Sequence, residues 1–282
     1  MDLAIYQKRK RKNWLGLSFS LMAVLIGLFA LFWILYVLFA KGFSAFDLNF
    51  FTKNTPGAGT PGGGLLNAIV GSTLIVFTST FISTPIGIFA GIYLSEYGNE
   101  NKIANATRFV VDIMLSAPSI VVGLFIYAIY VNQVKHFSGF AGTMALALIA
   151  IPVVVKTTDN ILRLIPNSLR EAAYALGAPK WKVSTTVILK AGRSGVITGI
   201  LLSIARVSGE TAPLIFTALN SQFFSLDMNN PISNLPVVIY QFAMSAYDNW
   251  IQLAWGGALL ITLIVLTLNV LSRTLLGEKY DL

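Results

Sequence analysis

From residue 166 the sequence reads PNSLREAAYALGAPKWK (166–182), and from residue 206 it reads RVSGETAPL (206–214). The first segment is polar and basic. The second lies inside a long apolar segment and still carries Arg206 and Glu210. A basic hairpin that leads into an apolar segment with charged residues inside it is not typical of a soluble domain, so the two segments together indicate a membrane protein.

The basic segment predicts two short helices joined by a tight turn. Ser168 and Glu171 have the spacing of a capping box, which begins a helix. Gly177 stands where a left-handed turn ends that helix, and Pro179 suits the first position of the next helix.

The side chains of Ala172 and Ala173 are small, so another protein could approach that side of the first helix closely. Local features alone favour an ordinary amphipathic loop over a docking element, because a motif is a hypothesis until its context agrees.

Composition excludes several classes of function. The chain has 282 residues and a mean hydropathy of +0.72, and only 11% of its residues are charged, against about a quarter in soluble domains. With no cysteine and one histidine, we expect no disulfide, no metal site and no cofactor. No glycine run leads into a Gly-Lys-Ser or Gly-Lys-Thr, and no nucleophile–base set appears, so we expect neither ATP binding nor catalysis by this chain.

The apolar pattern predicts an all-α polytopic membrane protein with six transmembrane helices. The expected spans are 15–40, 65–94, 109–131, 140–155, 196–219 and 250–276. Pro118 should kink the third span. The apolar segment 235–244 is too short to cross and predicts an interfacial or re-entrant helix. The loop 41–64 is rich in Gly, Pro and Thr, a composition that predicts a flexible connector.

The expected organisation has three parts. Residues 1–64 hold a basic segment, the first span and an extracytoplasmic loop, residues 65–276 hold five spans with the hairpin at about 156–193, and residues 277–282 form a tail. In the second span, Gly87 and Gly91 form a small-xxx-small pair that predicts close helix packing. The many Ser and Thr hydroxyls of that span could bond to their own helix or line a polar path.

Lysine and arginine placement predicts the orientation. With the N-terminus in the cytosol, sixteen basic residues fall on the cytosolic side and three, Lys41, Lys53 and Lys135, on the other. The prediction is a multi-pass protein of the cytoplasmic membrane with both termini and the hairpin in the cytosol. The net charge of +8 therefore indicates a lipid bilayer rather than a nucleic acid as its partner.

The fifth span carries a polar stripe at helical spacing. The stripe comprises Gly199, Ser203, Arg206, Glu210, Pro213 and Thr217. Arg206 is expected near the bilayer midplane, where each ionised side chain costs about 3 kcal/mol. Two interpretations have similar weight: Arg206 and Glu210 form an i,i+4 ion pair that locks the helix, or Arg206 meets a solute.

The hairpin resembles the EAA loop of ABC-importer permeases. The resemblance rests on Glu171-Ala172-Ala173, three further residues and Gly177 in the last large cytosolic loop, although the proline that ends the family pattern is replaced by Lys190. It implies a type I ABC importer permease (MetI-like) fold and a loop that docks into a separate ATPase. The coupling residues would be Arg170, Glu171, Ala172, Ala173 and Gly177.

The 206–214 segment resembles permease subunits of the PstA type from phosphate importers, as do GGLLNAIVGS (63–72) and the hairpin. The resemblance implies a permease subunit of an ATP-driven phosphate importer, with Arg206, Glu210 and Ser203 along the substrate path. It also implies a second permease of the PstC type, two ATPase subunits of the PstB type and an extracytoplasmic phosphate-binding protein of the PstS type. The loop 220–249, which has Asp227 and Asp248 but no Lys or Arg, would be a surface for that binding protein.

Two other functions remain open from the sequence. One is an ABC permease for another oxyanion, molybdate or sulfate, and the other is a transporter or channel driven by a gradient, without an ATPase. The second usually shows internal repeats. We find no convincing repeat between the two halves of the chain.

Overall fold

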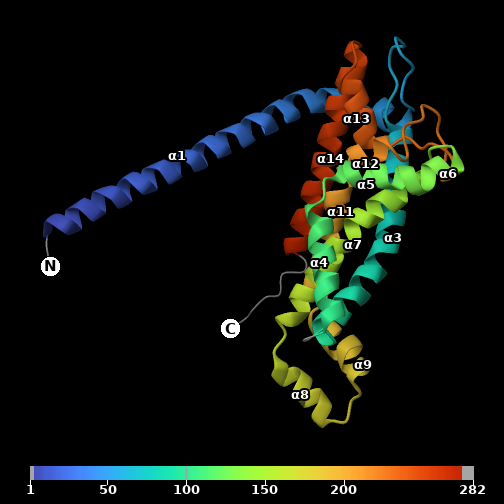
Figure 1. Cartoon of the computed structure of the whole chain (residues 1–282). Helices are drawn as coiled ribbons and strands as arrows, with labels where there is room; N and C mark the ends of the chain where they lie inside the picture. The colour runs from blue at the N-terminus through green and yellow to red at the C-terminus, as the bar shows by residue number, and fades with distance from the viewer. Residues whose placement is uncertain (1–2, 99–100, 275–282) are drawn as a thin grey trace.

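The computed structural model describes residues 3–98 and 101–274, and this part of the chain is all-α, as predicted (Figure 1). Within the described residues, four helices are long and apolar enough to cross a membrane: α1 (Leu3–Gly42), α3 (Leu66–Glu96), α7 (Gly139–Arg163) and α14 (Asp248–Thr274). They correspond to the first, second, fourth and sixth predicted spans. The predicted tail, 277–282, lies outside the described residues.

The end of the fourth span was predicted too early. Helix α7 continues past residue 155 to Arg163, so the hairpin loop begins eight residues later than expected. Its last two turns are polar, but the side chains of Asp159 and Arg163 bond to each other there at 2.8 Å, which lets the helix continue.

The third span is broken rather than kinked. Helix α4 (Lys102–Ser116) and the segment of α5 (Ser119–Ile126), η2 (Tyr127–Val131) and α6 (Asn132–Val134) meet at 103°. Pro118 has no N–H to give and forces Ala117 into an extended conformation, so the chain leaves α4 and starts a new helix. In Figure 1, α5 and α6 run across the bundle instead of along it.

The fifth span also differs from the prediction of one helix over 196–219. Helix α9 (Lys180–Lys182), η3 (Val183–Ile188) and α10 (Leu189–Ala191) form one helical unit that meets α11 (Arg193–Val207) at 73°. Helix α11 ends at Val207, and a separate short helix, α12 (Ala212–Ile215), follows. If each bent pair counts as one span, the described residues provide up to six spans.

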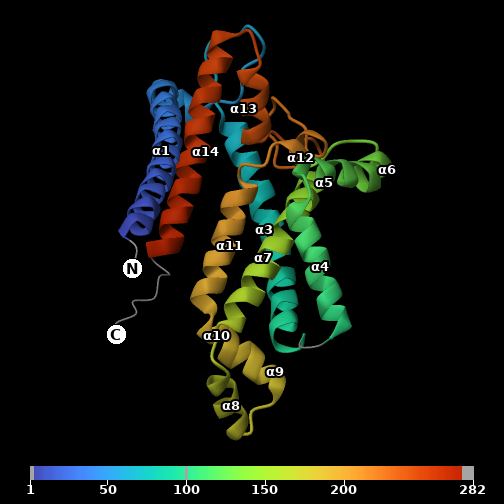
Figure 2. The same cartoon turned by 60° about the vertical axis from the view of Figure 1, so that its left-hand side comes forward.

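Helix α7 is the centre of the bundle, and its packing against α3 depends on two glycines. A Cβ at Gly87 would lie 2.5 Å from Cβ of Val154, and one at Gly91 would lie 2.5 Å from Cβ of Thr158. The small-xxx-small prediction is therefore confirmed, since only glycine permits this approach. Figure 2 shows α7 between α11 and α4, with α3 behind it.

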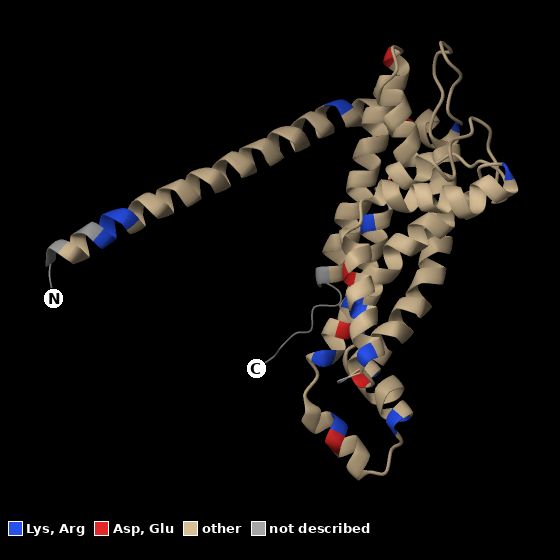
Figure 3. Cartoon of the chain, in the orientation of Figure 1, with Lys and Arg blue, Asp and Glu red and all other residues tan. Residues whose placement is uncertain are grey.

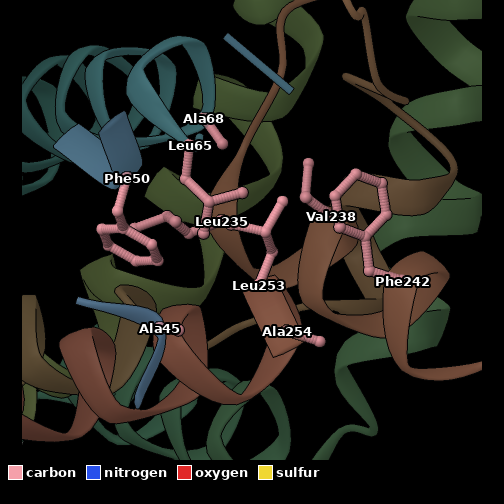
Figure 4. Packing of buried hydrophobic residues seen from close by; sticks show 9 residues of the cluster. All are labelled: Ala45, Phe50, Leu65, Ala68, Leu235, Val238, Phe242, Leu253 and Ala254. Atoms are coloured by element: carbon pink, nitrogen blue, oxygen red, sulfur yellow. The ribbon is translucent and has the colours of Figure 1, made fainter. Parts of the chain in front are cut away.

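At the opposite end from the hairpin, short helices close the bundle. They are η1 (Phe43–Ala45), α2 (Leu48–Thr52) and α13 (Leu235–Ala243). Together with α3 and α14 they bury an apolar cluster of Ala45, Phe50, Leu65, Ala68, Leu235, Val238, Phe242, Leu253 and Ala254 (Figure 4). The short helix predicted at 235–244 is confirmed, whereas the loop 41–64 contains α2, which was not predicted.

The glycine-rich loop after α2 is anchored to the bundle. The side chain of Asn67, which is buried, accepts a hydrogen bond from the Thr55 N–H and donates to Thr55 Oγ1 and to the Ser221 carbonyl. One amide thus joins the loop, the start of α3 and the segment after α12. A loop held in this way is less free than the flexible connector that its composition indicated.

Candidate functional site

The hairpin has the predicted helix–turn–helix form with different caps. Helix α8 (Asn167–Ala175) begins after Pro166 without a side-chain cap, so the capping box of Ser168 and Glu171 is not formed. At the other end Gly177 has φ +77°, and the N–H of Ala178 bonds to the Ala173 carbonyl at 3.2 Å. That is the left-handed ending expected of Gly177. Pro179 caps α9 instead of being its first residue.

The five predicted coupling residues divide into two groups. Glu171, Ala172 and Gly177 are exposed and form the part of the hairpin that a partner could contact. Ala173 is buried in a cluster with Val183 and Ile188, which holds the two helices of the hairpin together. The side chain of Arg170 is directed toward Glu96 of α3.

Arg170 ties the hairpin to the bundle. Its guanidinium contacts the carboxylate of Glu96, with Nη2 at 2.6 Å and Nε at 3.2 Å from Oε1. It also donates to the Leu162 carbonyl in the last turn of α7 at 2.8 Å and to the Ile165 carbonyl just after that helix at 2.6 Å. The side chains of Arg170 and Glu96 are only 15% and 3% exposed. We call this arrangement the Arg170–Glu96 contact, and it connects α8 to both α3 and α7.

A second ionic contact lies beside it. The buried carboxylate of Asp159 accepts hydrogen bonds from Arg108 Nε at 3.2 Å and from Arg163 Nε at 2.8 Å. Arg108 also donates to the Leu94 carbonyl in the last turn of α3. These bonds join α4, α7 and α3 at their hairpin ends. The positive charges of the two arginines also interact favourably with the dipoles of α3 and α7, because they lie near the C-termini of these helices.

Sequence reasoning missed the roles of Glu96, Arg108 and Asp159. The spacing of Asp159 and Arg163 was a usable signal, since oppositely charged residues four apart pair on a helix. The partner of Arg170 was not accessible in this way, because Glu96 lies 74 residues away in the sequence.

The predicted path residues lie at the far end of α11. Ser203 is buried, and Arg206 is exposed in the last turn of that helix, where a positive charge is favoured by the helix dipole. Glu210 lies beyond the helix end and is half-buried. The ion pairs of the described residues do not include one between Arg206 and Glu210, so the predicted i,i+4 lock is not formed. The continuous stripe is wrong because α11 ends at Val207, before Glu210, Pro213 and Thr217.

Most hydroxyls of α3 serve the helix itself. Thr73, Thr78, Ser79 and Thr80 each donate to a carbonyl three or four residues earlier. Thr78 Oγ1 also lies 2.8 Å from Thr143 Oγ1 on α7. Of the two interpretations of these hydroxyls, the structural one is favoured.

The charges of the chain are unevenly placed. Figure 3 shows Lys and Arg gathered in the lower half of the bundle, around α8 and α9, and at the N-terminal half of α1. Few charges lie in the upper half. The basic residues of the bundle thus gather at its hairpin end, whereas those of α1 lie apart from it at the N-terminal end of that helix.

Comparisons with known proteins agree with this architecture. A model of the family "Binding-protein-dependent transport system inner membrane component" matches residues 83–277. The chain is 59% identical to the phosphate transport system permease protein PstA of Pasteurella multocida over 96% of both chains, and 55% identical to that of Yersinia pestis over 96% of this chain and 92% of the relative.

Among solved structures, an inward-facing conformation of the MetNI methionine ABC transporter superposes with a TM-score of 0.62 at 20% identity. The match covers 75% of this chain and 94% of the other, and it shows that the two share a fold. The fold is thus the MetI-like fold of ABC importer permeases, as predicted. The chain belongs to the family of binding-protein-dependent transport system inner membrane components, whose members are transport subunits rather than enzymes.

Proposed function

We propose that this chain is a membrane permease subunit of an ATP-driven importer of inorganic phosphate. The observation that carries the proposal is its 59% identity, over 96% of both chains, to a phosphate transport system permease protein PstA. One such subunit provides one wall of a path, so a second permease, of the PstC type, completes it. ATP is hydrolysed by two separate subunits of the PstB type, and phosphate is delivered by an extracytoplasmic binding protein of the PstS type.

The orientation follows the charge distribution. The hairpin end of the bundle faces the cytosol, where an ATPase can reach it, and both termini lie on that side. The exposed residues Glu171, Ala172 and Gly177 form the contact surface for the ATPase. The Arg170–Glu96 contact then transmits movement of the hairpin to α3 and α7.

The opposite end receives the binding protein. The segment between α12 and α14 carries Asp227, whose pKa is lowered by a hydrogen bond from the backbone N–H of Asn229, helped by the side chains of Asn230 and Asn229. The carboxylate therefore stays ionised at neutral pH and fixes the turn. This acidic, well-formed turn lies on the surface that we assign to the binding protein.

Arg206 is the residue of this chain that meets the anion. A guanidinium binds two phosphate oxygens at once, and Arg206 is exposed, without an ion-pair partner among the described residues. Glu210, which lies just beyond the end of α11, limits how tightly the anion is held, and the buried Ser203 supports the same face of the helix.

Changing Arg206→Gln tests this role. Loss of a charged hydrogen bond is worth about 1.5–3 kcal/mol, so we expect phosphate uptake to fall by about tenfold or more. The measurement is labelled-phosphate uptake by an assembled complex that still hydrolyses ATP. Normal uptake by such a complex rules out contact between Arg206 and the anion.

A further inference from the structure

A polar cleft lies between the hairpin and the end of the bundle, below which α8 and α9 are seen in Figure 1. Its bundle wall includes Glu96 of α3 and Arg163 of α7. Its hairpin wall includes Arg170, Tyr174 and Lys180. The cleft has a volume of about 260 Å³. A water molecule takes about 30 Å³, so the cleft has room for several waters and therefore for a tetrahedral oxyanion.

The cleft is on the inner face of the hairpin, away from the surface assigned to the ATPase. Its lining residues on α8 are Asn167, Arg170 and Tyr174, which are three and four residues apart and so share one face of the helix. Ala172 is two residues from Arg170, a turn of about 200°, and faces the other way. A ligand in the cleft therefore leaves the ATPase contact free.

The groups that would repel an anion from the cleft are already paired. Nη2 of Arg170 lies 2.6 Å from the carboxylate of Glu96. The same guanidinium donates to two carbonyls at and just beyond the end of α7. Arg163 and Lys180 then add a positive charge to each wall, and a cleft lined by one sign of charge concentrates ions of the opposite sign.

Three side chains of the cleft keep donors without a partner among the described residues. Arg163 gives its Nε to Asp159 at 2.8 Å, which leaves Nη1 and Nη2 for a ligand. Lys180 forms no ion pair in the described part of the chain, and its Nζ lies over the ring of Tyr97, 4.4 Å from the ring centre. This contact holds the ammonium group at the end of α3. The hydroxyl of Tyr174 is likewise unpaired within residues 3–98 and 101–274.

We propose that this cleft is a second anion site, which binds a phosphate group between Arg163 of the bundle and Lys180 of the hairpin. A guanidinium offers two parallel donors to phosphate oxygens, an ammonium group offers three, and the hydroxyl of Tyr174 adds one more. Because the anion contacts both walls, it reinforces the attachment that the Arg170–Glu96 contact provides. The site is separate from Arg206, and binding to it needs neither transport nor ATP hydrolysis.

Two sources supply this chemistry. One is free inorganic phosphate on the hairpin side, and the other is the phosphate headgroup of an anionic lipid, because the cleft lies where the membrane helices α3 and α7 end. Both present the same oxygens to the same donors, so the experiment below is designed to distinguish them.

The test is equilibrium binding of labelled inorganic phosphate to the complex of this chain with its partner permease and ATPase subunits, without the binding protein. The chain carries Arg206→Gln, which removes the proposed path contact, and a non-hydrolysable ATP analogue fills the nucleotide sites. In phosphatidylcholine nanodiscs we expect each copy of the chain to bind one phosphate ion. Because the readout is binding rather than uptake, a negative result overturns this site and leaves the proposed function standing.

Variants of Lys180 show whether the cleft holds the bound phosphate. Lys180→Gln is expected to weaken binding about tenfold or more, from the loss of a charged hydrogen bond, whereas Lys180→Arg keeps the charge and most of the binding. Lys182→Gln is the matched control, since Lys182 is an exposed lysine of the same short helix outside the cleft. Unchanged binding in Lys180→Gln, or an equal loss in Lys182→Gln, overturns the site.

The lipid distinguishes the two sources. If a headgroup occupies the cleft, labelled phosphate binds more weakly in phosphatidylglycerol nanodiscs than in phosphatidylcholine, and Lys180→Gln removes the difference. Equal binding in the two lipids identifies free phosphate as the ligand.

Hydrogen exchange tests whether the anion connects the two walls. We expect phosphate to slow the exchange of the backbone amides of 167–182 in the Arg206→Gln complex, and to have no such effect when Lys180→Gln is also present. Binding that leaves the exchange of these amides unchanged overturns the proposed connection between hairpin and bundle.

Discussion

Replacing Arg170 with glutamine is expected to lower phosphate uptake about a hundredfold while the assembled complex continues to hydrolyse ATP. The substitution leaves the carboxylate of Glu96, 3% exposed, without its cation. Removal of one partner of a buried ion pair costs about 3–5 kcal/mol of stability. A cost of about 2.8 kcal/mol already changes an equilibrium constant about a hundredfold, so the attached position of the hairpin becomes rare. The hairpin keeps its exposed surface for the ATPase but loses its fixed attachment to α3 and α7.

The ratio of uptake to ATP hydrolysis is the quantity to measure. Arg170→Lys should also be defective, because the compact ammonium group of lysine does not reproduce the fork of Arg170 that contacts Glu96 and the Leu162 and Ile165 carbonyls together. Lys190→Gln, an exposed residue beyond the hairpin turn, is the matched control and should keep the ratio of the unchanged chain. Uptake and hydrolysis that fall in parallel, or a normal ratio in Arg170→Gln, would contradict a transmitting role.

Replacing Gly91 with valine is expected to prevent assembly of the complex. A Cβ at this position would lie 2.5 Å from Cβ and 2.7 Å from Cγ2 of Thr158, and 3.1 Å from the Val155 carbonyl. Overpacking a close contact costs about 1–3 kcal/mol, and a branched side chain next to backbone atoms has no room to adjust. Helices α3 and α7 would separate at their contact in the middle of the bundle.

The yield of the detergent-purified complex by size-exclusion chromatography measures this effect. Gly91→Ala should reduce the yield or the melting temperature less than Gly91→Val does. Because a Cβ at Gly87 would also clash, Gly87→Ala should likewise be less harmful than Gly87→Val. Gly27→Ala on α1 is the control, because a Cβ there meets no atom within 4 Å. A normal yield of Gly91→Val would show that α3 and α7 do not need this close approach.

Features that depend on a few neighbouring residues could be predicted from the sequence. Gly177 ends α8 because only glycine readily takes its positive φ, and Gly87 and Gly91 are spaced for one helix face. The apolar lengths of α1, α3 and α14 also predicted their positions. In each case the signal lies within one continuous segment of the chain.

Features that depend on distant partners could not be predicted. The side chain of Arg170 was expected at the ATPase contact, and its actual partner, Glu96, belongs to another helix. The break after Val207 did have local signals in Gly209 and Pro213, but the hydropathy of 196–219 outweighed them. As a result Arg206 and Glu210 were predicted on one helix, whereas Glu210 lies beyond the end of α11.

We propose that this chain forms part of a phosphate path driven by a separate ATPase. The decisive experiment is labelled-phosphate uptake by proteoliposomes that contain the chain with its partner permease, ATPase subunits and binding protein. We expect uptake only when ATP is present on the hairpin side and the ATPase subunits are intact. Uptake of the same size without the ATPase subunits, driven by an ion gradient alone, would show that the chain does not depend on an ATPase.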